Sequence, residues 1–486
     1  MLLRDIIEKN KLSRKTAVIY KDIHYTYKNL YDDCVDVSKK LLFCEGNVGI
    51  FLPNSYDYVV TFFSVSFAGK IVAPISINST ASEINKALSY CDISVIVTNS
   101  IYFELLKKHV NDLDIYDVYL IDRKEFIKGN TLNKTENITS IVNEDSLFLL
   151  VHTSGSVSHP KRVMLSHKNL ISNAYSIIES LELTPDEITL IVLPLFLISA
   201  ITSQMVAHML IGATIVILEL PFMINNFLNE CEKHSVTNLT CVPTVLNLVT
   251  LRDPIIKKFA TLRKICFGGA PTPKQKIVNL IERFPAMSFI HMYGQTEASA
   301  RLTHLLPKDF KEHIGSVGKA IPKVNLRIED DNGAICQPMV IGEVCAKGDN
   351  IMLGYYKNPD STKTTLINGW LHTGDLGYFD YSGFLYIVGR KKNIIISKGI
   401  NIYPEEIEEV LLSHKSILDA VVYGIKDEIL GEVVCAKIVL IADMNESDII
   451  EYCSRILSSY KVPKKIIFCN NIDKTATGKI RRVNNE

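Results

Sequence analysis

The sequence predicts an α/β fold with a large N-terminal domain and a smaller C-terminal domain. At 486 residues, of which 47% are hydrophobic, the chain exceeds what one core usually organises. Short apolar runs alternate with helical stretches through the first half, and shorter strands separated by glycine turns begin near residue 315. We therefore expect layered α/β subdomains and a small β-barrel-like module in residues 1–391, followed by an α+β domain in residues 392–486.

The first half of the chain has the pattern of parallel β-structure. Apolar strands that alternate with helices are typical of a mainly parallel sheet covered on both faces. A helix is expected over residues 55–68, and a second helix begins at Ser82 with Glu83 in its first turn. The expected strands of this half span residues 48–52, 71–75, 94–97 and 147–151.

Residues 190–223 are unusually apolar and resemble a membrane hairpin. A membrane span requires about 20 consecutive apolar residues. Here the polar or helix-breaking residues divide the stretch into shorter pieces; they are Pro194, Ser199, Gln204, His208 and Gly212. We therefore expect a buried strand, a helix and a strand, and no transmembrane segment.

In the second half of the chain the expected strands are shorter and are separated by turns. Strands are expected over residues 324–328, 342–346 and 384–388, and the turns between them contain Gly333 and Gly383. This pattern predicts a small antiparallel or barrel-like module. After it come a basic segment, a helix starting at residues 403–406, and strands over residues 421–423 and 433–441. These elements predict an α+β lid near residues 393–486.

Composition restricts the partners and the compartment. Lys+Arg and Asp+Glu are 53 each, which gives no support to a nucleic-acid or anionic-membrane partner. The eleven cysteines are scattered and form no C-x-x-C pair, so we expect reduced thiols in a cytoplasmic protein. The first residues reach a charge at Arg4, too early for a secretory leader. No histidine has metal-ligand spacing to a partner, and no signal indicates an oligomeric state.

Several motifs, in a fixed order, suit chemistry on the α-phosphate of a nucleotide. The Thr153–Lys161 loop follows an expected buried strand and offers backbone N–H groups and hydroxyls to phosphates. Glu297 can hold Mg²⁺, and Asp375 can accept two ribose hydroxyls. Arg390 can clamp an oxyanion, and Lys479 can reach charge that develops in a transition state. Each feature alone has an ordinary structural explanation, so the order of all of them carries the prediction.

These motifs resemble the adenylate-forming superfamily of acyl-CoA synthetases, carrier-protein adenylation domains and luciferases over nearly the full chain. The matching segments are residues 153–161, 267–271, 293–297, 315–318, 354–356, 369–375, 389–390, 397–399 and 477–479. The resemblance implies two steps: a carboxylic acid and MgATP give an acyl-adenylate and pyrophosphate, and then a thiol takes the acyl group. The enzyme expected is an AMP-forming acid–thiol ligase.

The resemblance also implies a role for individual residues. Catalysis is assigned to Lys479, which would bridge the carboxylate and the α-phosphate, to Thr296 on the α-phosphate, and to Arg390 on ribose or phosphate. Glu297 would hold Mg²⁺. Phosphates would contact Thr153, Ser154, Gly155, Ser156 and Lys161. Adenine would lie against Gly269, Ala270, Pro271, Met292, Tyr293, Gly294 and Gln295, with the ribose on Asp375. The acid pocket would involve Leu197, Phe267, Gly268 and His291.

The small C-terminal domain of this family rotates between the two half-reactions. The resemblance assigns the hinge to Lys392 and the tunnel for the thiol arm to Ser397, Lys398 and Gly399. The expected acceptor is CoA or a phosphopantetheinyl carrier protein. The sequence ends shortly after Lys479, so no fused carrier domain is expected.

The chain departs from the family pattern at several positions. Ser158 and Arg162 stand where the phosphate loop has glycines, and a non-glycine residue there costs roughly 1–2 kcal/mol if φ must be positive. Leu197 stands where many acyl-CoA synthetases carry a gating histidine, and Asn393 replaces a common hinge aspartate.

The expected substrate is a fatty or aryl carboxylic acid. Amino-acid-activating relatives carry an aspartate in the segment equivalent to residues 194–200, which contains no acidic residue here, and an unpaired ammonium would be costly there. Three alternatives stay open: a stand-alone ligase of an amino acid onto a carrier protein, a degenerate non-catalytic nucleotide-binding homologue, and adenylation followed by oxidation.

Overall fold

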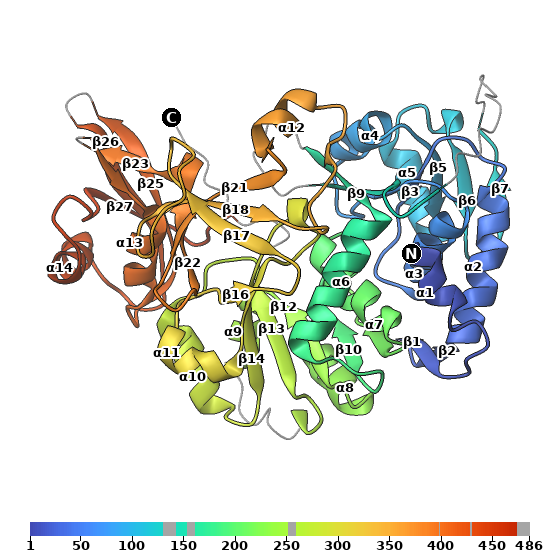
Figure 1. Cartoon of the computed structure of the whole chain (residues 1–486), viewed down its shortest axis with the longest axis horizontal. Helices are drawn as coiled ribbons and strands as arrows, with labels where there is room; N and C mark the ends of the chain where they lie inside the picture. The colour runs from blue at the N-terminus through green and yellow to red at the C-terminus, as the bar shows by residue number, and fades with distance from the viewer. Residues whose placement is uncertain (130–141, 153–160, 251–258, 398, 428–429, 474–486) are drawn as a thin grey trace.

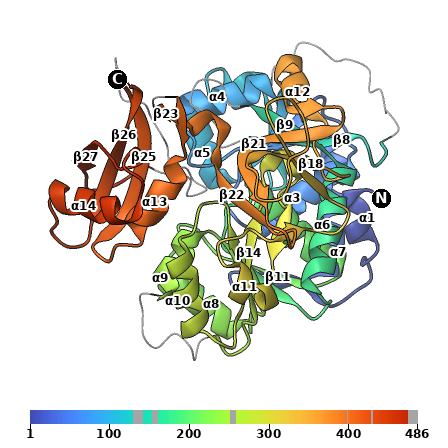
Figure 2. The ribbon, with the colours of Figure 1, turned by 60° about the vertical axis from the view of Figure 1, so that its left-hand side comes forward.

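The computed structural model describes residues 1–129, 142–152, 161–250, 259–397, 399–427 and 430–473 (Figure 1). The strands in these residues form four sheets, two of them large and mostly parallel and two smaller. Figure 2 shows the C-terminal part of the chain as a separate body beside the large N-terminal part.

The first large sheet has nine strands in the order β16-β15-β14-β13-β12-β10-β11-β1-β2. Strands β1 and β10 to β14 run parallel to one another, and β2, β15 and β16 are antiparallel additions at the two edges. The strands are β1 (Thr16–Tyr20), β2 (Ile23–Thr26), β10 (Ile188–Ile191), β11 (Thr214–Ile217), β12 (Asn238–Cys241), β13 (Lys264–Gly268), β14 (Ser288–Tyr293), β15 (Thr303–Leu305) and β16 (Lys319–Ala320).

The second large sheet has eight strands in the order β19-β9-β8-β4-β3-β5-β6-β7. It contains all four strands that the sequence predicts in the first half of the chain. The strands are β3 (Asn47–Ile50), β4 (Val72–Pro74), β5 (Ile93–Thr98), β6 (Asp117–Leu120), β7 (Glu125–Ile127), β8 (Leu147–His152), β9 (Arg162–Ser166) and β19 (Gly354–Tyr355).

The division into two sheets follows from helix α3 (Tyr56–Phe67). Ten of its twelve residues are buried, on every side of the helix, which is typical of a helix enclosed between layers rather than lying on a surface. The helix packs on β3 of one sheet and on β1 of the other. The sequence predicts this helix over residues 55–68 and layered α/β subdomains, but it does not indicate that the helix lies between two sheets; Ser55 is the N-cap.

The other helices cover the sheets or connect their strands. They are α1 (Leu3–Glu8), α2 (Tyr27–Leu41), α4 (Ala81–Tyr90), α5 (Ser100–His109), α6 (His167–Leu181), α7 (Ala207–Leu210), α8 (Ile224–Lys233), α9 (Pro243–Thr250), α10 (Lys274–Arg283), α11 (Phe310–His313), α12 (Pro359–Thr365), α13 (Pro404–Leu412) and α14 (Glu446–Ile456). The predicted start at Ser82 is one residue late, because Thr80 is the N-cap and shares a capping box with Glu83.

The apolar stretch 190–223 forms a buried strand, helix and strand, as predicted. Its central helix is a π-helix over Ser199–Val206 that continues into α7. Among the described residues, no helix has both the length and the apolar character needed to cross a membrane. Short π-helical segments are frequent at functional sites, which directs attention to this segment.

A small antiparallel sheet follows, as the shorter strands predict. It has the order β17-β18-β21-β20, with β22 also paired to β21. Its strands are β17 (Asn325–Glu329), β18 (Gly342–Lys347), β20 (Leu366–Ile367), β21 (Trp370–Phe379) and β22 (Leu385–Arg390). The two predicted glycine turns are present. Gly333 N–H donates to the Asp330 carbonyl oxygen and Gly383 N–H to the Asp380 carbonyl oxygen, both at 3.0 Å.

The C-terminal body has its own sheet and its own core. Helices α13 and α14 pack with β23 (Ile395–Ser397), β24 (Ile400–Ile402), β25 (Ile417–Asp427), β26 (Gly431–Leu440) and β27 (Lys465–Phe468). A separate hydrophobic cluster runs from Ile395 to Ile466. The α+β character predicted for this region is thereby confirmed.

Gly318 gives a test of the packing between the small sheet and β15. A Cβ at this position would lie 1.9 Å from the His304 carbonyl oxygen, and its φ is +92°. We expect Gly318→Ala to lower the thermal unfolding midpoint clearly, because overpacking adds about 1–3 kcal/mol to a backbone strain of roughly 1–2 kcal/mol.

Gly333→Ala is the matched control. Its φ is +80°, but no atom lies within 4 Å of the added Cβ, so this variant carries the strain alone. Equal unfolding midpoints of the two variants in calorimetry would contradict the close packing described for Gly318.

Candidate active site

A buried carboxylate, an arginine and a tyrosine meet where the nine-stranded sheet borders the small antiparallel sheet. Asp375 on β21 lies directly opposite Arg390 on β22. Arg390 Nε donates to Asp375 Oδ1 at 2.7 Å, and the Tyr293 hydroxyl donates to Asp375 Oδ2 at 2.8 Å. Burial and the Asp375 charge raise the pKa of Tyr293 well above its ordinary value. The phenol therefore stays protonated and remains a hydrogen-bond donor.

The turn that carries Asp375 is fixed by its own hydrogen bonds. Thr373 Oγ1 donates to the Val344 carbonyl and accepts from the Asp375 N–H. Gly374 has φ +72°, which favours glycine, and its N–H donates to Glu343 Oε1 at 3.0 Å. The carboxylate predicted to bind ribose thus lies within β21, with its backbone fixed by these hydrogen bonds.

A second group joins Glu297, Tyr355 and Lys161. Glu297 lies in a 3₁₀ turn over Thr296–Ala298 and accepts a hydrogen bond from the Tyr355 hydroxyl at 2.9 Å. Lys161 Nζ lies 4.6 Å from the centre of the Tyr355 ring. Strand β19 carries Tyr355 and pairs with β9, which begins next to Lys161. One acidic oxygen donor beside a phosphate-loop lysine fits a magnesium ion that also binds phosphates.

Basic side chains converge between these two groups. Burial, together with the neighbouring Arg390 charge and with Lys161, lowers the pKa of Lys392, although Asp375 opposes this. Lys392 lies in the short 3₁₀ helix over Lys391–Asn393, directly after β22. The mutual influence of three cations indicates a local positive potential suited to a polyphosphate.

The backbone at the carboxyl ends of β13 and β14 is packed too closely for side chains. A Cβ on Gly268 would lie 2.2 Å from the Met292 carbonyl oxygen, and one on Gly294 would lie 2.1 Å from that of Ala300. Gly269 has φ +85°, and Ala300, just after the 3₁₀ turn, has φ +115°. Ligands of open α/β sheets bind at such strand ends, and strained residues concentrate at functional sites.

The predicted acid-pocket residues are partly explained by packing. Phe267 and His291 are opposite one another on β13 and β14, and their rings stack with centroids 4.9 Å apart. Burial lowers the pKa of His291 to about 4, and its Nδ1 lies 3.0 Å from the Ser316 carbonyl oxygen. His291 is therefore neutral at physiological pH. Leu197 lies at the start of the π-helical segment and is only partly buried.

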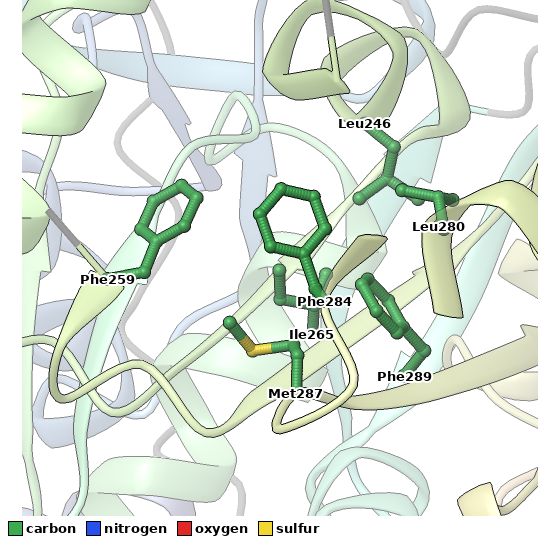
Figure 3. Close-up of a pocket in the computed structure, with 7 residues that line it drawn as sticks. All are labelled: Leu246, Phe259, Ile265, Leu280, Phe284, Met287 and Phe289. Carbon is green, nitrogen blue, oxygen red and sulfur yellow. The ribbon is translucent and has the colours of Figure 1, made fainter. Parts of the chain in front are cut away.

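The apolar cavity in Figure 3 is a separate feature. Its seven lining side chains carry no nitrogen or oxygen; they are Leu246, Phe259, Ile265, Leu280, Phe284, Met287 and Phe289. Ile265 and Phe289 are opposite one another near the starts of their strands, away from the carboxyl ends. This cavity offers nothing to orient a nucleotide.

Several predicted residues lie outside the described residues. These are Thr153, Ser154, Gly155, Ser156, Lys398 and Lys479, and also Ser158. Of the predicted tunnel residues, Ser397 is buried at the end of β23 and Gly399 has φ +76°. Arg162 is a β-strand residue without a positive φ, so the backbone strain considered for a non-glycine residue does not arise there.

Sequence reasoning missed three residues of this region. Tyr355 stands in the matching segment 354–356 but was given no role from the sequence, and Glu343 reaches the site only through strand pairing. Arg301 is 2% exposed and bonds to Ser203, Thr240 and His304 rather than to a carboxylate among the described residues.

Comparison with known proteins gives the family. A family model described as "AMP-binding enzyme" matches residues 7–356, and one described as "AMP-binding enzyme C-terminal domain" matches residues 406–479. These matches confirm the resemblance stated from the motifs.

Relatives and solved structures agree with the family models. A probable CoA ligase, CCL9, of Humulus lupulus is 31% identical and covers 96% of this chain and 92% of its own length. The 2-succinylbenzoate–CoA ligase of Bacillus cereus is 30% identical, and the match covers 96% of this chain and 94% of that protein. The structure of the o-succinylbenzoate CoA synthetase of Bacillus subtilis with an acyl-adenylate has a TM-score of 0.87 at 28% identity, covering 99% of this chain and 97% of its own. The predicted two-domain fold is thereby confirmed.

The Tyr355–Glu297 contact gives a test of the site. We expect Tyr355→Phe to weaken binding of MgATP about 10- to 100-fold in calorimetry, because a hydrogen bond to a charged group contributes about 1.5–3 kcal/mol. Tyr356→Phe is the control, since its hydroxyl instead bonds Asp92 at 2.6 Å on the surface. Equal affinities of the two variants would remove Tyr355 from the site.

Proposed function

The chain belongs to the AMP-binding enzyme family, and we propose that it joins an aromatic carboxylic acid to CoA through an acyl-adenylate. The observation that carries this proposal is the convergence of Asp375–Arg390–Tyr293 with Lys161–Tyr355–Glu297 around one basic centre. In the first step a carboxylate oxygen attacks the α-phosphorus of ATP, and pyrophosphate leaves. In the second step the CoA thiol attacks the acyl carbonyl, and AMP leaves.

The described residues divide this work between binding and charge neutralisation. Asp375 would accept the ribose hydroxyls, since Arg390 and Tyr293 orient both of its oxygens. Adenine would lie between Gly269–Pro271 and Met292–Gln295, at the strand ends that the close packing of Gly268 and Gly294 holds together. Thr296 would contact the α-phosphate.

Glu297 and Lys161 would hold the metal–phosphate end of the nucleotide. Magnesium, when bound, neutralises phosphate charge and so favours departure of pyrophosphate. The loop residues Thr153, Ser154, Gly155 and Ser156 would also contact the phosphates, a role that rests on the sequence motif alone. Structures of the Bacillus subtilis o-succinylbenzoate CoA synthetase include one in complex with ATP and magnesium ion, which supports MgATP as the nucleotide used by this chain.

The chemistry of the acid-binding wall favours a substrate without an ammonium group. Residues 194–200 contain no acid, and Leu195, Ile198 and Ala200 are buried. The π-helix that continues this wall contains Ser203, which accepts a hydrogen bond from the buried Arg301 at 3.1 Å. A buried positive charge repels a substrate ammonium and attracts anionic or polar substituents. This argues against the amino-acid alternative.

CoA is the proposed acceptor because the curated relatives are named as CoA ligases. We place the domain boundary at Lys392, between the end of β22 and the start of β23. Rotation there would exchange Lys479, which assists adenylation, for the Ser397–Gly399 loop, which would line the route of the thiol arm.

The cysteines are free thiols, which supports the cytoplasmic location we propose.

The degenerate-homologue alternative loses part of its motivation. It rested on Ser158 and Arg162, and Arg162 occupies a regular strand position with its side chain buried. The paired Asp375 and Arg390 also have the geometry of an intact binding site. The luciferase-type alternative has no observation in its favour.

The substrate class is tested by ATP–pyrophosphate exchange across a panel of acids. We expect exchange with aromatic acids, with the highest rate for those bearing a second carboxylate or hydroxyl, and none above background with amino acids. Exchange confined to amino acids would refute the substrate assignment. No exchange with any acid, despite ATP binding, would favour a non-catalytic homologue.

The role of Lys479 is tested separately in each half-reaction. We expect Lys479→Ala to slow adenylation by about 10²–10³-fold, the typical loss for one donor to developing charge. Transfer of a supplied acyl-adenylate to CoA should change little. Lys464→Ala, an exposed lysine of the same domain, is the control. Equal loss in both half-reactions would contradict the proposed alternation.

A further inference from the structure

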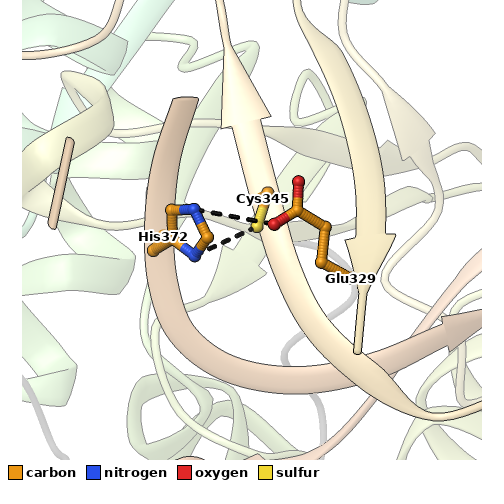
Figure 4. A group of neighbouring side chains, drawn as sticks. All are labelled: Glu329, Cys345 and His372. Atoms are coloured by element: carbon orange, nitrogen blue, oxygen red, sulfur yellow. Dashed lines mark hydrogen bonds and ion pairs between the residues drawn. The ribbon is translucent and has the colours of Figure 1, made fainter. Parts of the chain in front are cut away.

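Three adjacent strands of the small antiparallel sheet bring metal-binding side chains together. Arg327 on β17 lies opposite Cys345 on β18, and Cys345 lies opposite His372 on β21. Glu329 lies two residues further along β17 and therefore on the same face as Arg327. Figure 4 shows the Glu329, Cys345 and His372 side chains converging on one point. Glu329 and His372 are 43 positions apart in the sequence, with Cys345 between them, so no short motif indicates that the three side chains lie together.

The separations suit a tetrahedral ion. Cys345 Sγ lies 3.5 Å from His372 Nδ1, and Glu329 Oε2 lies 3.7 Å from His372 Nε2. The three candidate ligand atoms lie within 4.8 Å of one another. Zinc bonds of about 2.3 Å to sulfur and about 2.0–2.2 Å to nitrogen or oxygen give tetrahedral edges of roughly 3.3–3.6 Å. Cys345 and Glu329 face different nitrogens of the His372 ring, and an ion can bind only one of them, so a side chain must rotate to bring all three ligands onto the same ion.

Glu329 is oriented from outside the cluster. Arg327 forms an ion pair with its Oε1, and the Arg327 guanidinium lies 3.9 Å from the centre of the Trp370 ring. This arrangement leaves Oε2 directed to the imidazole. Groups of this kind fix the orientation of metal ligands in known sites.

A fourth ligand and an approach are also present. Glu343 Oε2 lies 3.4 Å from His372 Nδ1, and its other oxygen accepts from Gly374 N–H. Cys345 and Glu329 are buried, whereas the His372 side chain is 15% exposed. An ion can therefore enter on the imidazole side, and Glu343 or water can complete its coordination.

We propose that Glu329, Cys345 and His372 bind a single divalent cation of zinc-like softness, at a site separate from the one assigned to Glu297. A thiolate, an imidazole and a carboxylate are a ligand set that zinc and cobalt accept and that magnesium does not favour. Binding replaces the thiol proton, which leaves to solvent as the Cys345–metal bond forms.

The environment of Cys345 argues against a role as a nucleophile. Burial, with the Glu329 and Glu343 carboxylates, raises the pKa of the Cys345 thiol to about 12. A neutral, enclosed thiol reacts slowly with oxidants and electrophiles. A cation can still bind because it enters beside the two carboxylates.

Cobalt titration of the full chain, purified with a chelator and then freed of it, tests the proposal. We expect one equivalent of Co²⁺ to produce a thiolate-to-cobalt charge-transfer absorption and a tetrahedral visible spectrum. Cys345→Ser should abolish the charge-transfer band. Cys336→Ser is the matched control, because Cys336 belongs to the same small sheet region but not to the ligand set, and it should keep the band.

His372→Gln provides a second variant in case Cys345→Ser does not fold. We expect it to weaken zinc binding at least tenfold in competition with a chromogenic chelator, with an unchanged circular dichroism spectrum. Absence of a thiolate band in the unaltered protein, or a band that survives in Cys345→Ser, would overturn the site. So would unchanged zinc affinity of folded His372→Gln. None of these readouts depends on ligase activity, so the test is independent of the proposed function.

Discussion

The ion pair between Asp375 and Arg390 is the constraint on which the rest of the site depends. A buried carboxylate is costly unless it is paired and hydrogen-bonded, and Asp375 is only 5% exposed. Antiparallel pairing of β21 with β22 sets Arg390 directly opposite, and Tyr293 reaches the second oxygen from the nine-stranded sheet. Tyr293 thus links this pair, which lies within the small sheet, to the nine-stranded sheet, and Arg390 lies immediately before the segment proposed as the hinge.

The two large sheets contribute different ends of the site. The nine-stranded sheet supplies the close-packed glycines and Tyr293 at its carboxyl ends, where adenine is proposed to bind. The eight-stranded sheet supplies Lys161, and its edge strand β19 returns Tyr355 from almost two hundred residues later in the chain. The proposed phosphate end and the proposed nucleoside end of the site thereby lie on separate layers, and the charges of Arg390 and Lys161 both act on Lys392. Such an arrangement fixes a long, charged ligand in one orientation.

Much of the fold was predictable because it depends on local patterns. The strands at β3, β4, β5 and β8, the helix over residues 55–68 and the division of residues 190–223 follow from apolar periodicity. The separation into two sheets was not, since it depends on α3 being enclosed on both sides by strands distant in sequence. The same limit applies to the site. Asp375, Arg390 and Glu297 stand in motifs that indicate their roles. Tyr355 and His372 also lie in matching segments, but strand register sets the contacts of Tyr355 and Glu343 and brings Glu329, Cys345 and His372 together.

The central claim is that this chain makes an acyl-adenylate and then passes the acyl group to CoA. Its most direct test is a single-turnover experiment with purified protein, ATP, magnesium and an aromatic acid, followed by mass spectrometry of the quenched products. The account predicts up to one equivalent of acyl-adenylate per active site without CoA, and its conversion to acyl-CoA and AMP once CoA is added. Formation of ADP and phosphate, or of acyl-CoA without any adenylate detected at early times, would contradict it.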